Sequence, residues 1–401
     1  MATFFLIIIY LAFISLGLPD SMLGSAWPVM RLDFGAPVDR AGVLSVIVIS
    51  GTIISSLLSD RVLKRFGTGP VTFVSVAVTA LALLGYAYSP SIWWLAVLAL
   101  PLGLGGGSID VGLNNYVSTH YKAHHMSWLH CFWGIGAMLG PVIMSGYISS
   151  GESWRSAFLT VSLIQFGLVV LLFFTLPLWK RAEAGGVQAA SEGGGAAAEP
   201  RAEPPAGGIL RLKGVKLALV TFMFYSGVEA TLGLWGSSFL VNAKGLSAAT
   251  AAGWVSLYYG GITAGRFVAG FITFKLSNRA LIRIGLLVTL AGALVLALPL
   301  PAVFSLIGFI LIGLGLAPIF PSLLHETPAR FGKENSQKII GYQMAFAYTG
   351  GAILPPLLGW IAGRTTFMIL PLAMLGFTVI MLLSSEKINQ LINKRNQKEA
   401  V

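Results

Sequence analysis

The sequence predicts an all-α membrane protein in which twelve transmembrane helices form two pseudo-symmetric six-helix bundles. Of its 401 residues, 56% are hydrophobic and 10% are charged, and the mean hydropathy is +0.81. Ordinary soluble domains contain about 25% charged residues, so this composition excludes a soluble fold. It also excludes nucleic-acid binding as the reason for the net charge of +11, because the cytoplasmic loops of membrane proteins collect Lys and Arg.

Twelve stretches are apolar and long enough to cross a bilayer, which takes roughly 20 residues. We expect the helices near residues 3–30, 40–59, 70–88, 91–117, 127–148, 155–179, 215–241, 250–274, 281–299, 302–324, 339–362 and 364–385. One long hydrophilic segment, rich in Gly, Ala, Glu and Pro, follows the sixth stretch. Such a segment cannot bury enough apolar surface to fold. We therefore expect an N-terminal bundle over 1–180, a flexible cytoplasmic linker over 181–214, a C-terminal bundle over 215–385 and a cytoplasmic tail over 386–401.

The two halves resemble each other in sequence. Residues 103–115 (GLGGGSIDVGLNN) parallel residues 313–325 (GLGLAPIFPSLLH), GAMLGP from Gly136 parallels GAILPP from Gly351, and each copy lies 210 to 215 residues after its partner. Tandem halves are one repeat plan of secondary transporters, whose substrate sites lie near mid-membrane where the halves meet.

The basic residues predict the orientation. With the N-terminus inside, the cytoplasmic segments hold most of the 26 Lys and Arg residues; the others are Arg31, Arg40, Arg155, Lys244 and Arg364 in outside loops, and Arg266 within a helix. The positive-inside rule then predicts a multi-pass protein of a bacterial plasma membrane with both termini cytoplasmic. A cleaved signal peptide is not expected, because the start lacks a basic n-region and an A-x-A site. The single cysteine, Cys131, excludes a disulfide framework and a Cys-based metal site.

A charged motif follows the second helix. Residues 59–67 read SDRVLKRFG, which resembles the loop 2–3 signature of the major facilitator superfamily. The resemblance implies a fold of two six-helix bundles and a cytoplasmic latch formed by Asp60, Arg61, Lys64 and Arg65. The alternative is plain positive-inside charge, and the second-half copy (GFITFKLSNR) lacks the acidic residue.

Three carboxylates lie deep in predicted helices: Asp20, Asp110 and Glu229. A carboxylate at the bilayer centre costs roughly 2.5–3.5 kcal/mol on insertion scales, so it is rarely kept without a use. In a low-dielectric medium a carboxyl group also binds a proton more readily than in water. We expect these residues to serve proton coupling. The alternative is a structural carboxylate paired with a polar neighbour or, as a buried ion pair, with Arg266.

The fourth helix carries a polar face. Asp110 and Asn114 are four residues apart and share one face, and Asn115 follows. This Asp-x-x-x-Asn arrangement resembles the fucose permease branch of the superfamily, in which carboxylates of helices 1 and 4 serve proton coupling and sugar recognition. The matching positions here are Asp20 and Asp110. The chain departs from that pattern by having Asp in place of Glu and Asn115 in place of Pro.

Other polar and aromatic side chains on predicted helices are candidates for substrate contact. The aromatic rings among them have a polar edge and can stack on sugar faces. Some of these residues could instead serve packing or lie at the membrane interface. With Asn114 and Asn115, the candidates are His130, Trp133, Trp235, Tyr258, Tyr259, Gln343 and Tyr348.

Prolines predict broken helices, which are tolerated at membrane depth only where protein or water satisfies the backbone. Pro19 lies beside Asp20, Pro28 is expected to end the first helix, and Pro318 and Pro321 are expected to interrupt the tenth.

These observations predict a secondary active transporter that moves a small polar solute, a sugar in our interpretation, by proton-coupled symport with alternating access. A proton-coupled exporter of drugs or amphipathic metabolites and a non-transporting sensor or scaffold are the alternatives. We expect no enzymatic activity, cofactor or resident metal, with a proton or sodium as coupling ion. The expected partners are a small-molecule substrate and membrane lipid, without nucleic acid, and the expected functional unit is a monomer.

Overall fold

The computed structural model describes residues 2–121, 123–192, 208–272 and 275–399, and every regular element in that part of the chain is a helix. The first half contains α1 (Ala2–Asp20), α2 (Met22–Asp33), α3 (Arg40–Phe66), α4 (Thr68–Ala87), α5 (Ile92–His120), α6 (Ala123–Ser149) and α7 (Trp154–Glu192). The second half contains the short η1 (Ile209–Arg211), α8 (Val215–Lys244), α9 (Ala248–Ile272), α10 (Asn278–Ala297), α11 (Ala302–Leu316), α12 (Ile319–Phe331), α13 (Lys333–Ala362) and α14 (Ile369–Glu399).

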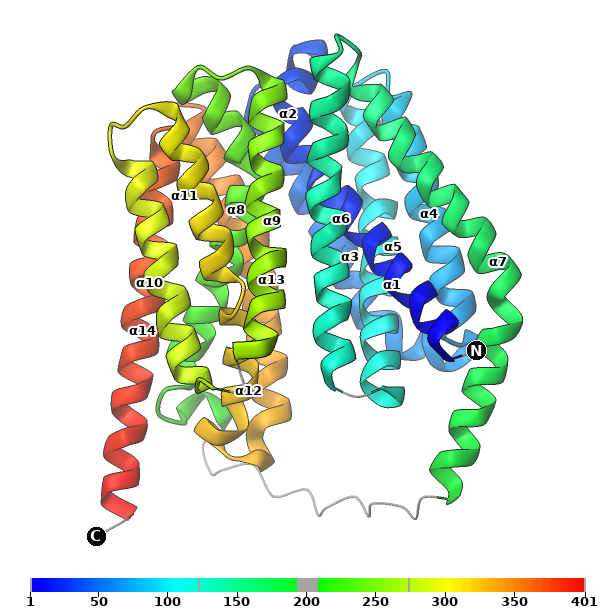
Figure 1. The fold of residues 1–401 in the computed structure, drawn as a ribbon, viewed down its shortest axis with the longest axis vertical. Helices are drawn as coiled ribbons and strands as arrows, with labels where there is room; N and C mark the ends of the chain where they lie inside the picture. The colour runs from blue at the N-terminus through cyan, green and yellow to red at the C-terminus, as the bar shows by residue number, and fades with distance from the viewer. Residues whose placement is uncertain (1, 122, 193–207, 273–274, 400–401) are drawn as a thin grey trace.

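These helices form twelve membrane-crossing units, as the sequence predicts. Eleven are long and apolar enough to span a membrane by length and composition; two of them are broken, one made of α1 and α2 and one of α11 and α12. The less apolar α9 takes the twelfth position. Figure 1 shows the units as two bundles side by side, α1–α7 and α8–α14. The predicted all-α membrane fold is confirmed.

The two broken units interrupt at Pro19 and Pro318, whereas Pro321, also expected to interrupt the tenth helix, lies in the first turn of α12. Ser21 separates α1 from α2 directly after Pro19 and Asp20, and Ala317 and Pro318 separate α11 from α12. The expectation that Pro28 ends the first unit is wrong, because α2 continues to Asp33. Trp27 is fully buried beside the proline, and that packing offsets the roughly 3 kcal/mol that an interior proline costs.

Several helices run beyond their expected ends, and three of them extend into segments expected to be a loop, the linker or the tail. The motif at residues 59–67 was expected in a loop, but most of it forms the last turns of α3, which ends at Phe66 and is followed by Gly67 with φ +80°. At the ends of the halves, α7 reaches Glu192 inside the expected linker, and α14 reaches Glu399 inside the expected tail. Residues 193–207 of the expected linker lie outside the described residues.

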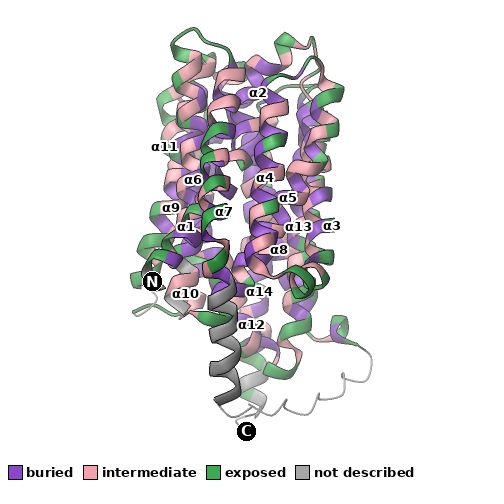
Figure 2. Ribbon diagram, turned by 90° about the vertical axis from the view of Figure 1, so that its right-hand side faces the viewer, coloured by how far each residue is buried: buried purple, intermediate pink, exposed green. Residues whose placement is uncertain are grey.

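The halves share a core on one side of the molecule. We call the side on which both chain ends lie the terminal side, and the other the opposite side (Figure 1). The largest buried apolar cluster joins both halves, and its first-half members, such as Trp27 and Leu44, lie toward the opposite side. On the terminal side each half has its own cluster, around Trp179 in one and Ile388 in the other. Buried residues line the inner helix faces in the middle of the molecule (Figure 2).

Glycines allow the closest approaches between the halves. A Cβ at Gly24 of α2 would overlap the Gly233 carbonyl of α8, and a Cβ at Gly42 of α3 would lie 2.8 Å from the Pro356 Cα of α13. The helix pair α6 and α9 forms a third junction, where the Ser145 Oγ donates to the Ala249 carbonyl at 2.8 Å. These residues place the tightest junctions toward the opposite side.

Candidate functional site

The candidate site begins at the break between α1 and α2. Asp20 is the last residue of α1, and its side chain is exposed although the helix packs between others of its bundle. Its Oδ2 accepts a hydrogen bond of 2.9 Å from the Trp133 indole Nε1 of α6. The helix break therefore presents a carboxylate to an indole N–H on a neighbouring helix of the same half.

A series of contacts continues from Trp133 into the other half. The Arg266 guanidinium of α9 lies over the Trp133 ring, 5.1 Å from its centroid, which is within the range of a cation–π interaction. The same guanidinium places its Nη2 3.5 Å from the Oε1 of Glu229 on α8. Asp20, Trp133, Arg266 and Glu229, from four helices, form what we call the central polar cluster.

The deep carboxylates differ in their counter-charges. Glu229 pairs with Arg266, and both side chains are largely buried, 21% and 14% exposed respectively. Asp20 instead accepts a hydrogen bond from the neutral indole of Trp133. A charge away from water needs a partner to be stable. Glu229 therefore has a cation beside it, while the described partner of the exposed Asp20 is a neutral group.

Asp110 lies on α5 with the predicted partner. The Asn114 Nδ2 donates to the Asp110 Oδ1 at 2.8 Å and to the Asp110 carbonyl at 2.9 Å. Tyr348 of α13, which belongs to the other half, is half-buried. Asn115, one position further round α5, is exposed.

Two tyrosines of α9 contact the central polar cluster from the second half. The Tyr258 hydroxyl donates to the Glu229 carbonyl at 3.2 Å. The Tyr259 ring packs edge-on against Trp133 with the ring centroids 6.4 Å apart, and its hydroxyl contacts Gly233. Both tyrosines are buried, so they position Trp133 and Glu229 more than they present open surface.

Two predicted substrate contacts lie elsewhere. Trp235 is fully buried, and its Nε1 donates to the Pro355 carbonyl at 2.7 Å, so packing between α8 and α13 takes up the ring. Gln343 is 1% exposed, and its amide oxygen accepts a hydrogen bond of 3.1 Å from the Thr327 hydroxyl of α12. In this conformation both side chains are used in packing, and their role in substrate contact stays a prediction. His130 is half-buried and packs edge-on against Phe13 at 5.9 Å.

The four latch candidates lie at the terminal end of α3. The Lys64 Nζ bonds to the Asp60 Oδ2 at 2.8 Å within this helix, and both side chains are more than 70% exposed (76% and 73%). Arg61 is exposed, and Arg65 lies over the neighbouring Phe66 ring. In this conformation the Lys64–Asp60 ion pair and the Arg65–Phe66 contact both lie within α3.

Sequence reasoning missed a polar network at the terminal side of the second half. The Glu326 Oε2 of α12 lies 3.2 Å from the Nε atoms of both Arg279 and Arg330. Arg330 also donates to Asn389 of α14 at 3.3 Å. The spacing of Glu326 and Arg330, four residues apart on one helix, is the signal that could have predicted part of it.

Among the described residues, no three His, Cys, Asp or Glu side chains gather as a metal site would require. The central polar cluster instead combines a carboxylate, an indole and an ion pair at the junction of the two halves. Such a set can bind and release a proton and donate hydrogen bonds to a polar solute.

Comparison with known proteins agrees with this architecture. The family model described as Major Facilitator Superfamily matches residues 9–355. The glucose/mannose transporter GlcP of Bacillus subtilis (strain 168) is 23% identical over 368 residues, which cover 90% of this chain and 88% of that protein. The hexuronate transporter of the same organism is 24% identical over 385 residues, with coverage of 90% and 88%.

A solved structure supports the fold. A variant of the nucleoside transporter NupG superposes with a TM-score of 0.73 at 15% identity, covering 95% of this chain and 98% of that one. The family match, the transporter relatives and the membrane-crossing helices together show a multi-pass membrane transporter rather than an enzyme. The chain belongs to the major facilitator superfamily.

Proposed function

We propose that the protein is a proton-coupled symporter of a small polar solute of the sugar class. The observation that carries the proposal is the environment of Asp20: an exposed carboxylate at the junction of the halves, bonded to a neutral indole. Glu229 already has Arg266 as its counter-charge. Asp20 is therefore the stronger candidate for the group that takes up the proton.

Coupling follows from the cost of enclosing a charge. In this conformation Asp20 is accessible to solvent. When the transporter closes around its substrate, an ionised carboxylate loses water, and burying an uncompensated charge costs several kcal/mol. A protonated carboxyl avoids that cost. The loaded carrier then closes readily only after Asp20 has bound a proton, which links the movement of the solute to the movement of the proton.

The substrate class rests on the surrounding groups and on the relatives. The Trp133 indole, the Asp110–Asn114 pair and the half-buried Tyr348 offer hydrogen-bonding groups and a ring face suited to a polyhydroxylated solute. Two relatives, each matched by this chain over 88% of its own length, are named as a glucose/mannose transporter and a hexuronate transporter. Glucose, mannose and a hexuronate are thus the first solutes to test.

We also propose the sidedness. The terminal ends of α3, α8, α10 and α13 carry basic residues such as Arg61, Lys216, Arg279 and Lys338. By the positive-inside rule the terminal side faces the cytoplasm of a bacterial plasma membrane. The shared core on the opposite side then makes the described conformation open to the cytoplasm.

The test is pH recording on proteoliposomes during addition of each solute. Wild type is expected to make the external medium alkaline as solute and protons enter together. Asp20→Asn and Asp110→Asn are expected to lose this signal, while Asp39→Asn, which changes a carboxylate before α3, should keep it. Solute entry without proton movement would refute proton symport, and proton release driven by drugs would favour the exporter.

A further inference from the structure

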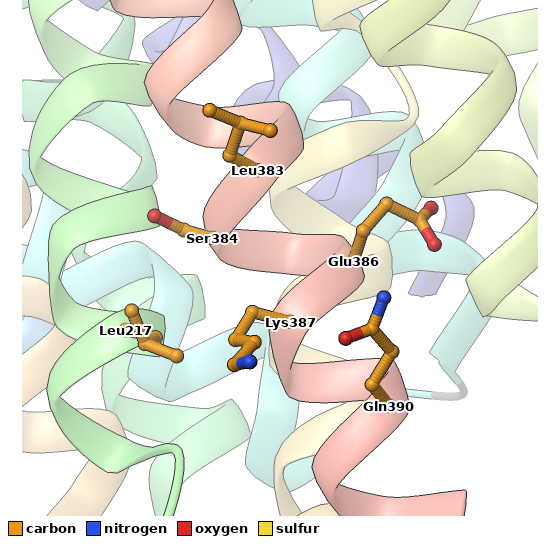
Figure 3. Close-up of a pocket in the computed structure, with 6 residues that line it drawn as sticks. All are labelled: Leu217, Leu383, Ser384, Glu386, Lys387 and Gln390. Carbon is orange, nitrogen blue, oxygen red and sulfur yellow. The ribbon is translucent and has the colours of Figure 1, made fainter.

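A groove lies at the terminal end of the second half, between α8 and α14, apart from the central polar cluster. It consists of two adjoining cavities of about 410 and 380 Å³ that share Leu217. The first is lined by Leu217, Leu383, Ser384, Glu386, Lys387 and Gln390 (Figure 3). The second follows the turn from η1 into α8.

The groove carries an excess of positive charge. Exposed basic side chains come from both of its ends: Arg211, Lys213 and Lys216 near η1, and Lys387 on α14. Among the described residues that line the two cavities, Glu386 is the one carboxylate. It is engaged elsewhere, because Arg283 binds its two oxygens at 2.7 and 2.6 Å. Four cations therefore face the groove without a compensating anion among its lining residues.

The helix terminus adds to this field. Gly214 precedes α8 in a left-handed conformation, φ +93°, and has no side chain with which to cap the first turn. The N-terminus of the thirty-residue α8 thus presents N–H groups and the positive end of its dipole to the second cavity, which Gly214 and Lys216 line. An anion is stabilised at such a position.

Two leucines of the lining face outward. Leu383 and Leu210 are 65% and 43% exposed, and α8 and α14 are both membrane-crossing helices. Ser384 and Lys387 lie on the side of α14 that faces α8 (Figure 3). Because the groove starts where α8 begins its span, we expect its cations at headgroup depth and its leucines beside the acyl chains.

We propose that this groove binds an anionic phospholipid, with the phosphate held by Lys213, Lys216, Lys387 and the α8 N-terminus and the acyl chains along Leu383. Basic pockets at the membrane boundary recognise such headgroups. The lipid joins the start of α8 to α14 and so fastens the terminal end of the second half. This role is independent of the transported solute.

The test is lipid titration of the purified full-length protein in detergent, followed by native mass spectrometry. Phosphatidylglycerol and phosphatidylcholine with identical acyl chains are compared. One phosphatidylglycerol is expected to bind in preference. Lys213→Gln/Lys387→Gln should weaken it by about fivefold per lysine, or roughly 25-fold in all. The matched control is Lys333→Gln/Lys338→Gln, two exposed lysines of α13 in the same half and on the same side, which should leave binding unchanged.

Two results would overturn the proposal. Equal binding of the two lipids, or equal losses in the two double variants, would show that the groove does not select the headgroup. Glycerophosphoglycerol, which has the headgroup without acyl chains, is expected to compete at least tenfold more weakly than the lipid. Competition at equal concentration would make a soluble phosphate compound the ligand and refute the lipid assignment.

Discussion

The contact of Gly24 on α2 with α8 can be used to shift the equilibrium between the conformation in which the halves meet on the opposite side and the one in which they separate there. A methyl group at this position would overlap the Gly233 carbonyl and lie 2.9 Å from the Leu234 Cα. Both neighbours are backbone of the other half, so no side-chain rotation relieves the overlap. Gly24→Ala is therefore expected to disfavour the conformation in which the halves meet on the opposite side.

The size of the effect follows from the cost of overpacking. An extra methyl group in a tightly packed interface costs about 1–3 kcal/mol. The overlap exists only while α2 and α8 are in contact, so the cost acts on one conformation and not on the other. A difference of that size changes the ratio of two conformations about 5- to 150-fold.

The assay uses a cysteine reporter. Cys131 is the only cysteine, so Cys131→Ser gives a background without thiols, and Ser145→Cys introduces one where α6 meets α9. A membrane-impermeant maleimide should modify this thiol at least fivefold faster in Gly24→Ala. The control is Gly146→Ala, which adds the same methyl group to α6 where no atom lies within 4 Å. Equal modification rates in the two variants would refute the reasoning.

Three further predictions concern stability, measured as thermal unfolding of the purified protein in detergent. Arg266→Gln leaves Glu229 without its cation, and breaking a buried ion pair in this way costs roughly 3–5 kcal/mol; we expect a loss of stability at the lower end of that range. Adding Glu229→Gln to the same chain should recover part of the loss. No recovery in the double variant would contradict the pairing. Glu326→Gln should cost more than replacement of either of its arginine partners, since it leaves two guanidinium groups together; a smaller cost would argue against a shared counter-ion. Gly67→Ala should cost about 1–3 kcal/mol because its φ of +80° suits only glycine. Gly167→Ala in open space on α7 should cost nothing, and equal unfolding midpoints of the two variants would contradict the strain.

The architecture follows from local properties of the sequence. Spans of about 20 apolar residues give the helices, and Pro19 and Pro318 mark the two breaks because a missing N–H and a fixed ring weaken the helix wherever they occur. Asp20 beside such a break could be recognised from its neighbours alone. Pro28 shows the limit of this reasoning, since the buried Trp27 keeps α2 intact.

The composition of the candidate site depends on packing that the sequence does not display. Trp133 and Trp235 are equally plausible cavity residues by type, yet one donates to Asp20 and the other to a buried carbonyl. The pairing of Arg266 with Glu229 remained one of several alternatives because the two residues lie on different helices. The end of α3 was missed for another reason: hydropathy marks the membrane boundary, whereas Leu, Lys and Arg favour the helix beyond it.

The most direct test separates solute exchange from proton-driven accumulation in proteoliposomes. If Asp20 carries the coupling proton, Asp20→Asn mimics the protonated carboxyl. This variant should still exchange labelled solute across the membrane, but it should no longer accumulate solute when a pH gradient is imposed. Glu229→Gln, which alters the carboxylate already paired with Arg266, should keep the response to the gradient. Gradient-driven accumulation by Asp20→Asn at the wild-type level would contradict the assignment of proton coupling to Asp20.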